Sequence, residues 1–514
     1  MVKVGRDRLP WILLVLAVLL GLVLRFEQLG LKPLWMDEVI TGIFSSGHGY
    51  GAVPIERVVN VGAFRSLFSF QPSRCVDIVE RVATQSVHPP LFFCWMHGWL
   101  AMFRDLPDWV MGLRSLPALV GGLLIVVMYG VNRVALGEKA GVGAAWVMAL
   151  SPFAVYLSQE ARHYTVPMVA IALGLMGMVR IQQDWQRSRV NPWVWLGWVV
   201  VNSLGFYIHY FCILATIAQI GSLLLWGVWK GERAGLWVPL MMATATIGLT
   251  YAPWFARFIS HIGRPETEWM RPFETHWWTS LMPIWQLLAG WMAMIVALPV
   301  EGQAIFLAIV MVLITVGFSI WIGRYVVAGL KRLLDHPATA DSTLVLMGFV
   351  GISVLEFLAI IFVLKKDITQ VPRYNFVYFP GVCALLGAAL VAKRENIKPF
   401  VGLLAIAFLS SQFVVSNLAF QKPYQPELFA ANINQDSPKN ALVVMGYKDY
   451  QDIARGVSFA LAIDRVAPET RFLFLRSAPN YGQLFDRLSG FESGDQLWVI
   501  APGLRRSEFR SGLR

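Results

Sequence analysis

The sequence predicts an all-α polytopic membrane protein with a small α/β soluble domain at its C-terminal end. Of 514 residues, 56% are hydrophobic and only 15% are charged, whereas soluble globular chains average about 25% charged residues. Uncharged runs long enough to cross a bilayer recur along the first 420 residues. Beyond them the charge density rises. This composition excludes soluble enzymes, fibrous proteins and disordered chains.

The first apolar run, residues 9–24, predicts an uncleaved transmembrane helix, because no small-residue cleavage site follows it and Arg25 closes it. The run 190–229 is too long for one helix, and its polar middle around His209 indicates two spans joined by a tight turn. In all, about eleven transmembrane helices are expected. The other candidate spans are 115–132, 140–157, 163–179, 234–256, 277–300, 302–323, 342–364, 374–392 and 399–420.

The basic residues orient these spans, because Lys and Arg prefer short cytoplasmic loops. An N-terminus inside places the first loop, residues 25–114, on the extracytoplasmic side. Segment 88–103 is then expected to be an amphipathic helix in the outer interface, since a span there would turn the later basic loops outward. The basic loop 324–341 stays inside if 277–300 is re-entrant or interfacial. The expected location is the plasma (inner) membrane.

The net charge of +11 is spread between the apolar runs rather than gathered in one block. The predicted surroundings are therefore membrane lipids, and no nucleic-acid partner is expected. The four cysteines show no pair spacing, so neither a metal site nor a disulfide scaffold is expected. They are Cys75, Cys94, Cys212 and Cys383.

Residues 421–514 are expected to form a separate extracytoplasmic domain after a transmembrane domain of residues 1–420. Charged residues number 22 in these last 94 positions against 53 in the first 420. Short apolar runs alternate there with helix-like stretches, a pattern that favours a small α/β domain. The expected strands are 441–445, 471–475 and 496–501, and the expected helices are 449–463 and 480–488.

Polar residues on the outer side are the candidates for chemistry. Asp37 and Glu38 are adjacent carboxylates just after the first helix, and such a pair can supply a general base and a partner for a metal or a hydrogen bond. Solvated loop acids would give the same pattern. His88 precedes two prolines and is either a ligand or only the first turn of the interfacial helix.

A second group lies at the outer junction of the third and fourth spans. Glu160 could place a substrate or cation, Arg162 could hold a carboxylate, and Tyr164 closes the same junction. A polar turn with an internal Glu–Arg pair is the alternative. The outer loop 264–278, rich in Trp and charged residues, indicates a lid or acceptor surface, although an interfacial segment would look the same.

Lys365, Lys366 and Arg373 depart from the charge rule, because the topology places them in an outer loop where basic residues are scarce. An anionic ligand at the outer membrane surface would explain them, since Arg and Lys bind phosphate well. Anchoring to lipid headgroups is the alternative.

Five segments, in order, resemble one family, the polyprenyl-phosphate-sugar-dependent glycosyltransferases of the GT-C fold. The nearest groups are the protein O-mannosyltransferase-like and aminoarabinose-transferase-like proteins, and the resemblance covers roughly residues 9–392. The segments are RFEQLGLKPLWMDEVIT at 25–41, HPPLFF at 88–93, GLRSLPALVGGLLIVVMYGV at 112–131, SPFAVYLSQEARHY at 151–164 and PRYNFVYFPGVCALLGAAL at 372–390.

The resemblance implies transfer of a hexose or pentose, with inversion, from a polyprenyl-phosphate carrier to an acceptor hydroxyl of a glycan, lipid or protein on the extracytoplasmic side. It implies that Asp37 is the catalytic base or orients the acceptor. Carrier-phosphate binding falls to Lys365, Lys366 and Arg373. No cofactor is firmly predicted, and a divalent cation is left open. The implied donor- and acceptor-binding residues are Glu38, His88, Glu160, Arg162 and Tyr164.

Two other functions fit parts of the sequence. A transporter or flippase of lipid-linked sugars predicts inverted repeats and charges along the membrane midplane, where the sequence offers only Glu356. A non-catalytic scaffold subunit predicts that replacing Asp37 has no effect. The sequence contains no Gly-rich nucleotide-binding loop, which favours a lipid-linked donor over a nucleotide sugar.

Overall fold

The computed structural model describes residues 8–104, 108–231, 237–264, 281–393, 396–435, 441–476 and 496–502. The chain divides into two compact units, and each is built from several stretches of sequence. The helical unit consists of Met1–Leu29, Arg114–Ser260 and Trp269–Gln421. The mixed unit consists of Gly30–Leu113, His261–Glu268 and Lys422–Arg514.

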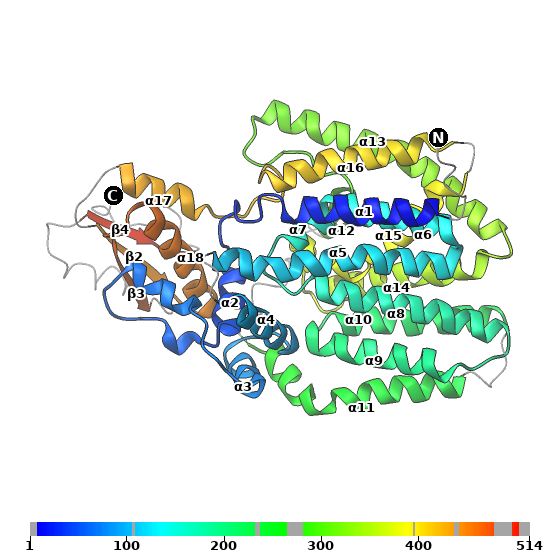
Figure 1. Cartoon of the computed structure of the whole chain (residues 1–514), viewed down its shortest axis with the longest axis horizontal. Coiled ribbons are helices and arrows are strands. Elements are labelled where there is room, and N and C mark those ends of the chain that lie inside the picture. The colour runs from blue at the N-terminus through cyan, green and yellow to red at the C-terminus, as the bar shows by residue number, and fades with distance from the viewer. Residues whose placement is uncertain are drawn as a thin grey trace. The chain divides into compact units, whose positions relative to one another are not determined.

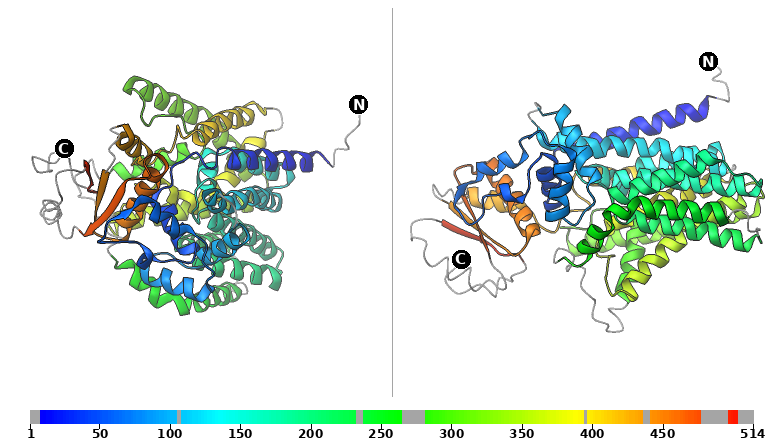
Figure 2. Two further views of the ribbon diagram at one scale, coloured as in Figure 1. Left: turned by 60° about the vertical axis from the view of Figure 1, so that its left-hand side comes forward. Right: turned by 90° about the horizontal axis from the view of Figure 1, so that it is seen from below.

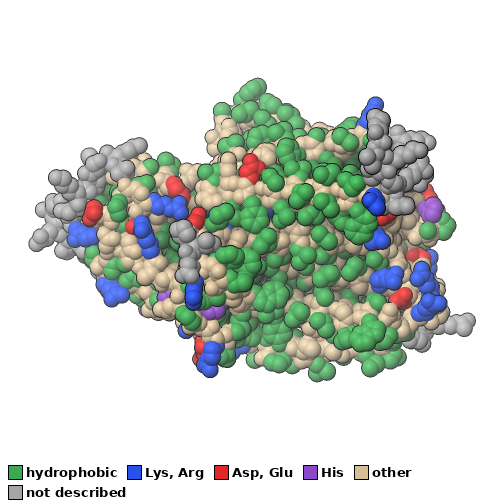
Figure 3. Space-filling model, viewed as in Figure 1, with side chains coloured by type: hydrophobic (Ala, Val, Ile, Leu, Met, Phe, Trp, Pro, Cys, Tyr) green, Lys and Arg blue, Asp and Glu red, His purple; other side chains and the backbone are tan. Residues whose placement is uncertain are grey.

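Long apolar helices make up the helical unit, and several of them lie roughly parallel to one another (Figure 1). In Figure 3, hydrophobic side chains dominate the visible surface over these helices, as expected for a surface that contacts lipid. The helices are α1 (Leu9–Phe26), α5 (Trp109–Leu136), α6 (Glu138–Leu150), α7 (Pro152–Ser158), α8 (Thr165–Gln186), α9 (Pro192–Ile208), α10 (Cys212–Trp229), α11 (Trp237–Ile262), α12 (Met282–Ala293), α13 (Ile305–Asp335), α14 (Ala340–Phe362), η6 (Pro372–Val377), α15 (Phe379–Val391) and α16 (Lys398–Val415).

The helices confirm a multi-pass membrane protein. Within the described residues, seven helices are long and apolar enough to cross a membrane, or eight if the bent pair α6–α7 is one span. This count is lower than the eleven expected from apolar runs, in part because α9 and α15 have only 17 and 13 residues. The run 190–229 does form two helices, joined at residues 209–211.

Two segments expected to lie in the interface contain short helices. α4 (Leu91–Met102) and α12 each have 12 residues, which at about 1.5 Å per residue rise about 18 Å, well short of a hydrocarbon core of about 30 Å. Pro90 is the N-cap of α4, in agreement with a helix that begins after the two prolines.

Small residues and buried hydrogen bonds join the helices of the helical unit. A Cβ on Gly143 of α6 would lie 2.6 Å from the carbonyl oxygen of Gly387 of α15, so these two helices meet backbone to backbone. Arg25, at the end of α1, is fully buried and donates to the carbonyls of Met148 and Ala149. Arg25 therefore supplies hydrogen-bond donors to two carbonyl oxygens at the C-terminal end of α6, which have no partner within the helix.

The mixed unit contains a four-stranded sheet in the order β1-β3-β2-β4. β2 is parallel to both β3 and β4, and β1 pairs with β3 in the antiparallel direction. The strands are β1 (Val59–Asn60), β2 (Ala441–Tyr447), β3 (Arg471–Arg476) and β4 (Gln496–Ile500). The helices are α2 (Met36–Ser45), η1 (Tyr50–Ala52), η2 (Val61–Phe68), α3 (Cys75–Gln85), α4, α17 (Pro426–Gln435) and α18 (Tyr450–Val466).

The central strand β2 is buried on both faces, and so is most of β3, as is usual for parallel strands. β4 is only partly buried. Val443 and Phe472 belong to the core that contains α18, whereas their neighbours Leu442 and Leu473 belong to a second apolar cluster. Figure 2 shows the orange helices beside the strands. The three strands expected after residue 440 and the helix expected at 449–463 are confirmed. The helix expected at 480–488 and most of the expected lid 264–278 lie outside the described residues.

One expectation about the cysteines is wrong. Cys75 and Cys94 form a disulfide across 19 residues, whereas Cys212 and Cys383 are free and buried. The spacing could not reveal this pair, because α3 and α4 are brought together by folding back on each other. The bridge links the start of α3 to the first turn of α4.

Candidate functional site

Asp37 lies in the first turn of α2, where the helix N-terminus favours a negative charge. Its side chain is 7% exposed, so Asp37 is not a solvated loop acid. Glu38 is 1% exposed and accepts a hydrogen bond from the backbone N–H of Trp35 at 3.3 Å. This contact is half of a capping box, so Glu38 helps to hold the helix start that presents Asp37.

Tyr424 packs against the start of α2 within the mixed unit. Its hydroxyl oxygen accepts a hydrogen bond from the N–H of Met36 at 2.6 Å, and its ring stacks between those of Trp35 and Phe459 at 5.7 and 5.5 Å. Burial raises the pKa of Tyr424 to about 12, and the charge of Asp37 acts in the same direction. Tyr424 is therefore a neutral phenol that fixes the backbone next to Asp37.

Two cations from the C-terminal stretch lie beside this segment. The guanidinium of Arg455 lies 5.9 Å from the ring of Tyr424, and its Nη2 is 3.9 Å from the sulfur of Met36. The amine of Lys422 lies 4.7 Å from the ring of Trp35. Arg455 also pairs with Asp452 at 3.2 Å. A buried acid such as Asp37 can accept a proton from a hydroxyl, and cations beside the same helix start can attract an anionic group.

His88 belongs to the same unit and has a structural partner. Its Nδ1 lies 2.8 Å from the hydroxyl of Ser86, and its ring meets the ring of Phe93 edge-on at 6.2 Å. These contacts fix the ring just before α4.

In the helical unit, residues 159–164 form the turn between α7 and α8, as expected. The turn is buried: Glu160, Arg162 and Tyr164 are 1–2% exposed. Gln159 anchors it by donating to the carbonyls of Leu24 and Glu27 at 3.1 and 2.9 Å. The polar side chains are thus held in a fixed backbone frame rather than on a solvated loop.

Tyr164 lies between two cations of the helical unit. The guanidinium carbons of Arg162 and Arg373 are each 6.0 Å from the centre of its ring. Arg373 belongs to η6, more than 200 residues further along the chain. The structure therefore brings Arg373 next to Arg162 and Tyr164, whereas the sequence analysis placed Arg373 in a separate group from these two residues.

An aromatic layer containing His209 borders this cluster. The ring of His209 lies 4.6 Å from that of His163 and 4.7 Å from that of Phe376. His209 occupies the turn between α9 and α10, where burial lowers its pKa to about 3 and the charge of Arg162 lowers it as well. His209 is therefore neutral at physiological pH and adds no positive charge to that of the two arginines.

The other basic residues of this loop are less buried. Lys365 is exposed and Lys366 is partly buried, and the backbone N–H of Lys366 donates to the carbonyl of Ile360 at 3.2 Å, which continues the end of α14. Asp367 is buried and accepts from the N–H and hydroxyl of Thr369. These hydrogen bonds hold a turn at residues 367–369 in the segment that connects α14 to Arg373.

Sequence reasoning missed several of these side chains. Tyr424 and Arg455 lie about 400 residues after Asp37, at separations of 387 and 418 positions, and nothing in their local sequence marks them. The polar turn at His209 was recognised only as a turn. Among the residues that the structure describes, no group of three or more His, Cys, Asp or Glu side chains is placed to hold a metal ion.

No protein-family model matches the sequence, and no curated protein matches it. Solved structures do resemble its fold. The aminoarabinose transferase ArnT from Cupriavidus metallidurans, bound to undecaprenyl phosphate, aligns with a TM-score of 0.54 at 13% identity over 93% of this chain and 94% of that one. Its apo form aligns with a TM-score of 0.53 at 13% identity over 93% and 95% of the two chains.

The oligosaccharyltransferase of Archaeoglobus fulgidus, in a complex with Zn and sulfate, aligns with a TM-score of 0.49 at 12% identity over 89% of this chain and 62% of that one. This chain therefore spans less than two thirds of the archaeal enzyme. The likeness to ArnT extends over nearly the whole of both chains and confirms the GT-C fold expected from the sequence.

Proposed function

We propose that this membrane protein is a glycosyltransferase that moves a hexose or pentose from a polyprenyl-phosphate carrier to an acceptor hydroxyl of a glycan, lipid or protein. The observation that carries the proposal is the shared GT-C fold with a transferase whose structure holds undecaprenyl phosphate. In this reaction the acceptor oxygen forms a bond to the anomeric carbon while the bond from that carbon to the carrier phosphate oxygen breaks. The configuration at the anomeric carbon is thereby inverted.

The leaving group of this reaction is a lipid phosphate that gains negative charge as its bond to the sugar breaks. Arg162 and Arg373 lie beside Tyr164, Arg162 buried and Arg373 partly exposed, and fixed cations stabilise such developing charge most strongly where water is excluded. We assign them to the carrier phosphate, with Lys365 and Lys366 as further contacts and Glu160 and Tyr164 to the donor sugar.

The acceptor hydroxyl must lose a proton. The carboxylate of Asp37 is the proposed base, because it is buried in the first turn of α2, where the helix N-terminus favours a negative charge. Glu38, at the start of α2, and His88, just before α4, would position the acceptor. The proposal assigns no cofactor to the reaction, and turnover with and without a chelator tests whether a divalent cation takes part.

The disulfide supports an extracytoplasmic location for the mixed unit. Disulfides persist in oxidising compartments and are rare in the cytosol, and Cys75–Cys94 lies in the first loop. This location agrees with the orientation expected from the basic loops and would place transfer on the outer face of the plasma membrane.

Turnover by the purified full-length protein in lipid tests the proposal. The protein is offered a panel of polyprenyl-phosphate hexoses and pentoses, with and without a chelator, and sugar release or transfer is followed together with the anomeric configuration of the product. Inverting turnover of one donor is expected. Movement of intact lipid-linked sugar across sealed vesicles without sugar release would replace the proposal with a flippase, and neither activity would favour a scaffold.

A further inference from the structure

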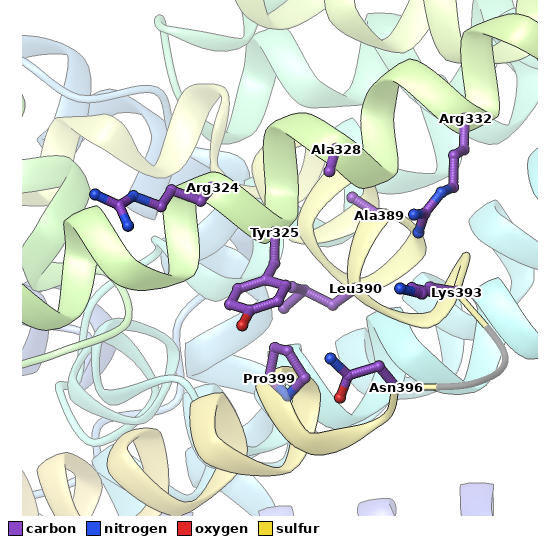
Figure 4. A pocket seen from close by; sticks show the side chains of 9 residues that line it. All are labelled: Arg324, Tyr325, Ala328, Arg332, Ala389, Leu390, Lys393, Asn396 and Pro399. Atoms are coloured by element: carbon purple, nitrogen blue, oxygen red, sulfur yellow. The ribbon is translucent and has the colours of Figure 1, made fainter.

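A small hollow lies between α13, α15 and α16 of the helical unit, away from the turn 159–164. It has a volume of about 230 Å³, more than ten times the roughly 15 Å³ that one water molecule needs. Figure 4 shows Arg332 of α13 and Lys393 after α15 pointing into it, while Arg324 points away along α13. The remaining lining residues are Tyr325, Ala328, Ala389, Leu390, Asn396 and Pro399.

The close crossing of α13 and α15 creates this hollow. A Cβ on Gly329 would lie only 2.1 Å from the carbonyl oxygen of Ala389, so the two backbones touch there. Tyr325 lies one turn before the crossing and Arg332 one turn after it, on the same face of α13. Because Ala328 and Ala389 are small, the longer side chains frame an open space instead of filling it.

Among the described residues, those that line the hollow carry positive charge and include no Asp or Glu. Arg332 and Lys393 approach the same space, and within the described part of the chain neither has a carboxylate within 4.0 Å. Two like charges held close together repel each other. An anion between them would relieve the repulsion, and a guanidinium beside an ammonium suits a phosphate group.

The hollow lies at the end of the bundle opposite the turn 159–164. Leu333 of α13 packs with Ala140 and Ala388, next to the junction of α5 and α6, whereas α6 and α7 run from that junction to the turn. The neighbouring part of α13 is apolar and exposed: Ile320 and Val327 are 57% and 55% exposed. A ligand there would meet cations at its head and an apolar surface beside its tail.

We propose that this pocket binds a phosphate group, carried by an anionic membrane lipid whose acyl chains lie along α13. The phosphate sits between Arg332 and Lys393, and Asn396 donates a further hydrogen bond. The site is separate from the proposed donor site and does not depend on the proposed transferase activity.

Lipid binding by the purified full-length protein tests this site. Affinity is measured in nanodiscs of phosphatidylcholine with increasing phosphatidylglycerol, and separately for inorganic phosphate and glycerol phosphate. Arg332→Gln/Lys393→Gln is expected to weaken phosphatidylglycerol binding about 10- to 30-fold, since each cation near a membrane surface contributes about a factor of five. Lys331→Gln/Arg187→Gln is the matched control, because it removes two exposed cations outside the pocket and should change affinity less than twofold.

A second variant keeps every charge and fills the hollow. Ala328→Leu should also abolish the preference for phosphatidylglycerol while leaving thermal unfolding in pure phosphatidylcholine unchanged. Equal lipid preference in wild type and Ala328→Leu would overturn the proposal, as would an equal loss in the control pair. Binding of inorganic or glycerol phosphate as tight as that of the lipid would overturn the lipid as the source.

Discussion

Removing the Cys75–Cys94 bridge should destabilise the region of α3 and α4 by a calculable amount. The bridge joins residues 19 apart in sequence and so closes a loop of about 20 residues. Chain-entropy arguments assign such a loop about 11 cal/mol/K, or about 3.3 kcal/mol at 25 °C. Reduction, or Cys75→Ser/Cys94→Ser, should therefore raise the opening equilibrium constant of this region by up to about 270-fold.

Amide hydrogen exchange of peptides from residues 75–94 measures this opening in the intact protein. Reductant should speed exchange in wild type and in the control variant Cys212→Ala/Cys383→Ala, which keeps the bridge and removes the two free thiols. It should have no effect on Cys75→Ser/Cys94→Ser. Exchange that is unchanged by reductant in wild type would refute the loop-closure argument.

The same control variant tests on which side of the membrane the first loop lies. In membranes isolated without reductant and then denatured, Cys212→Ala/Cys383→Ala should show no reactive thiol until it is reduced, because its two remaining cysteines are bridged. Two reactive thiols per chain before reduction would contradict an extracytoplasmic first loop.

Three further outcomes follow from the described contacts. Tyr424→Phe keeps the stacked ring but leaves the N–H of Met36 without its acceptor. The free energy of local opening at the start of α2, measured by hydrogen exchange, should therefore fall by about 1–3 kcal/mol; unchanged exchange would count against this contact. Arg373→Ala should weaken donor binding at least tenfold with the acceptor KM unchanged, and an unaltered donor Kd would contradict its role. Because the pKa of His209 is about 3 in the folded protein and about 6.5 when unfolded, the unfolded state binds more protons in between. Stability should therefore fall as pH drops from about 6.5 towards 3, and a chemical-denaturation series in which His209→Asn shows the same slope would refute this.

Local pattern was enough to predict the helices, because a membrane span must be a continuous apolar run. The turn at His209 and the buried strands after residue 440 followed from short-range signals of the same kind. The bend between α6 and α7 was invisible, since a run from 140 to 157 looks the same whether the helix is straight or broken by 59°.

The candidate site depended on contacts that no local pattern encodes. Tyr424 meets Met36 across 388 positions, and Arg373 meets Tyr164 across more than 200. β1 is only two residues long and takes its strand geometry from β3. Asp37 could be singled out by its chemistry, but its burial is a property of the folded mixed unit that its local sequence does not encode.

The measurement that tests the central claim most directly is sugar transfer by Asp37→Asn beside wild type. Glu80→Gln is the matched control, because it removes an exposed carboxylate of α3 in the same unit. Loss of a general base typically costs about 10²- to 10⁴-fold in rate, so Asp37→Asn should fall by that factor with unchanged thermal unfolding, while Glu80→Gln keeps wild-type turnover. Equal turnover by Asp37→Asn and wild type would contradict the account.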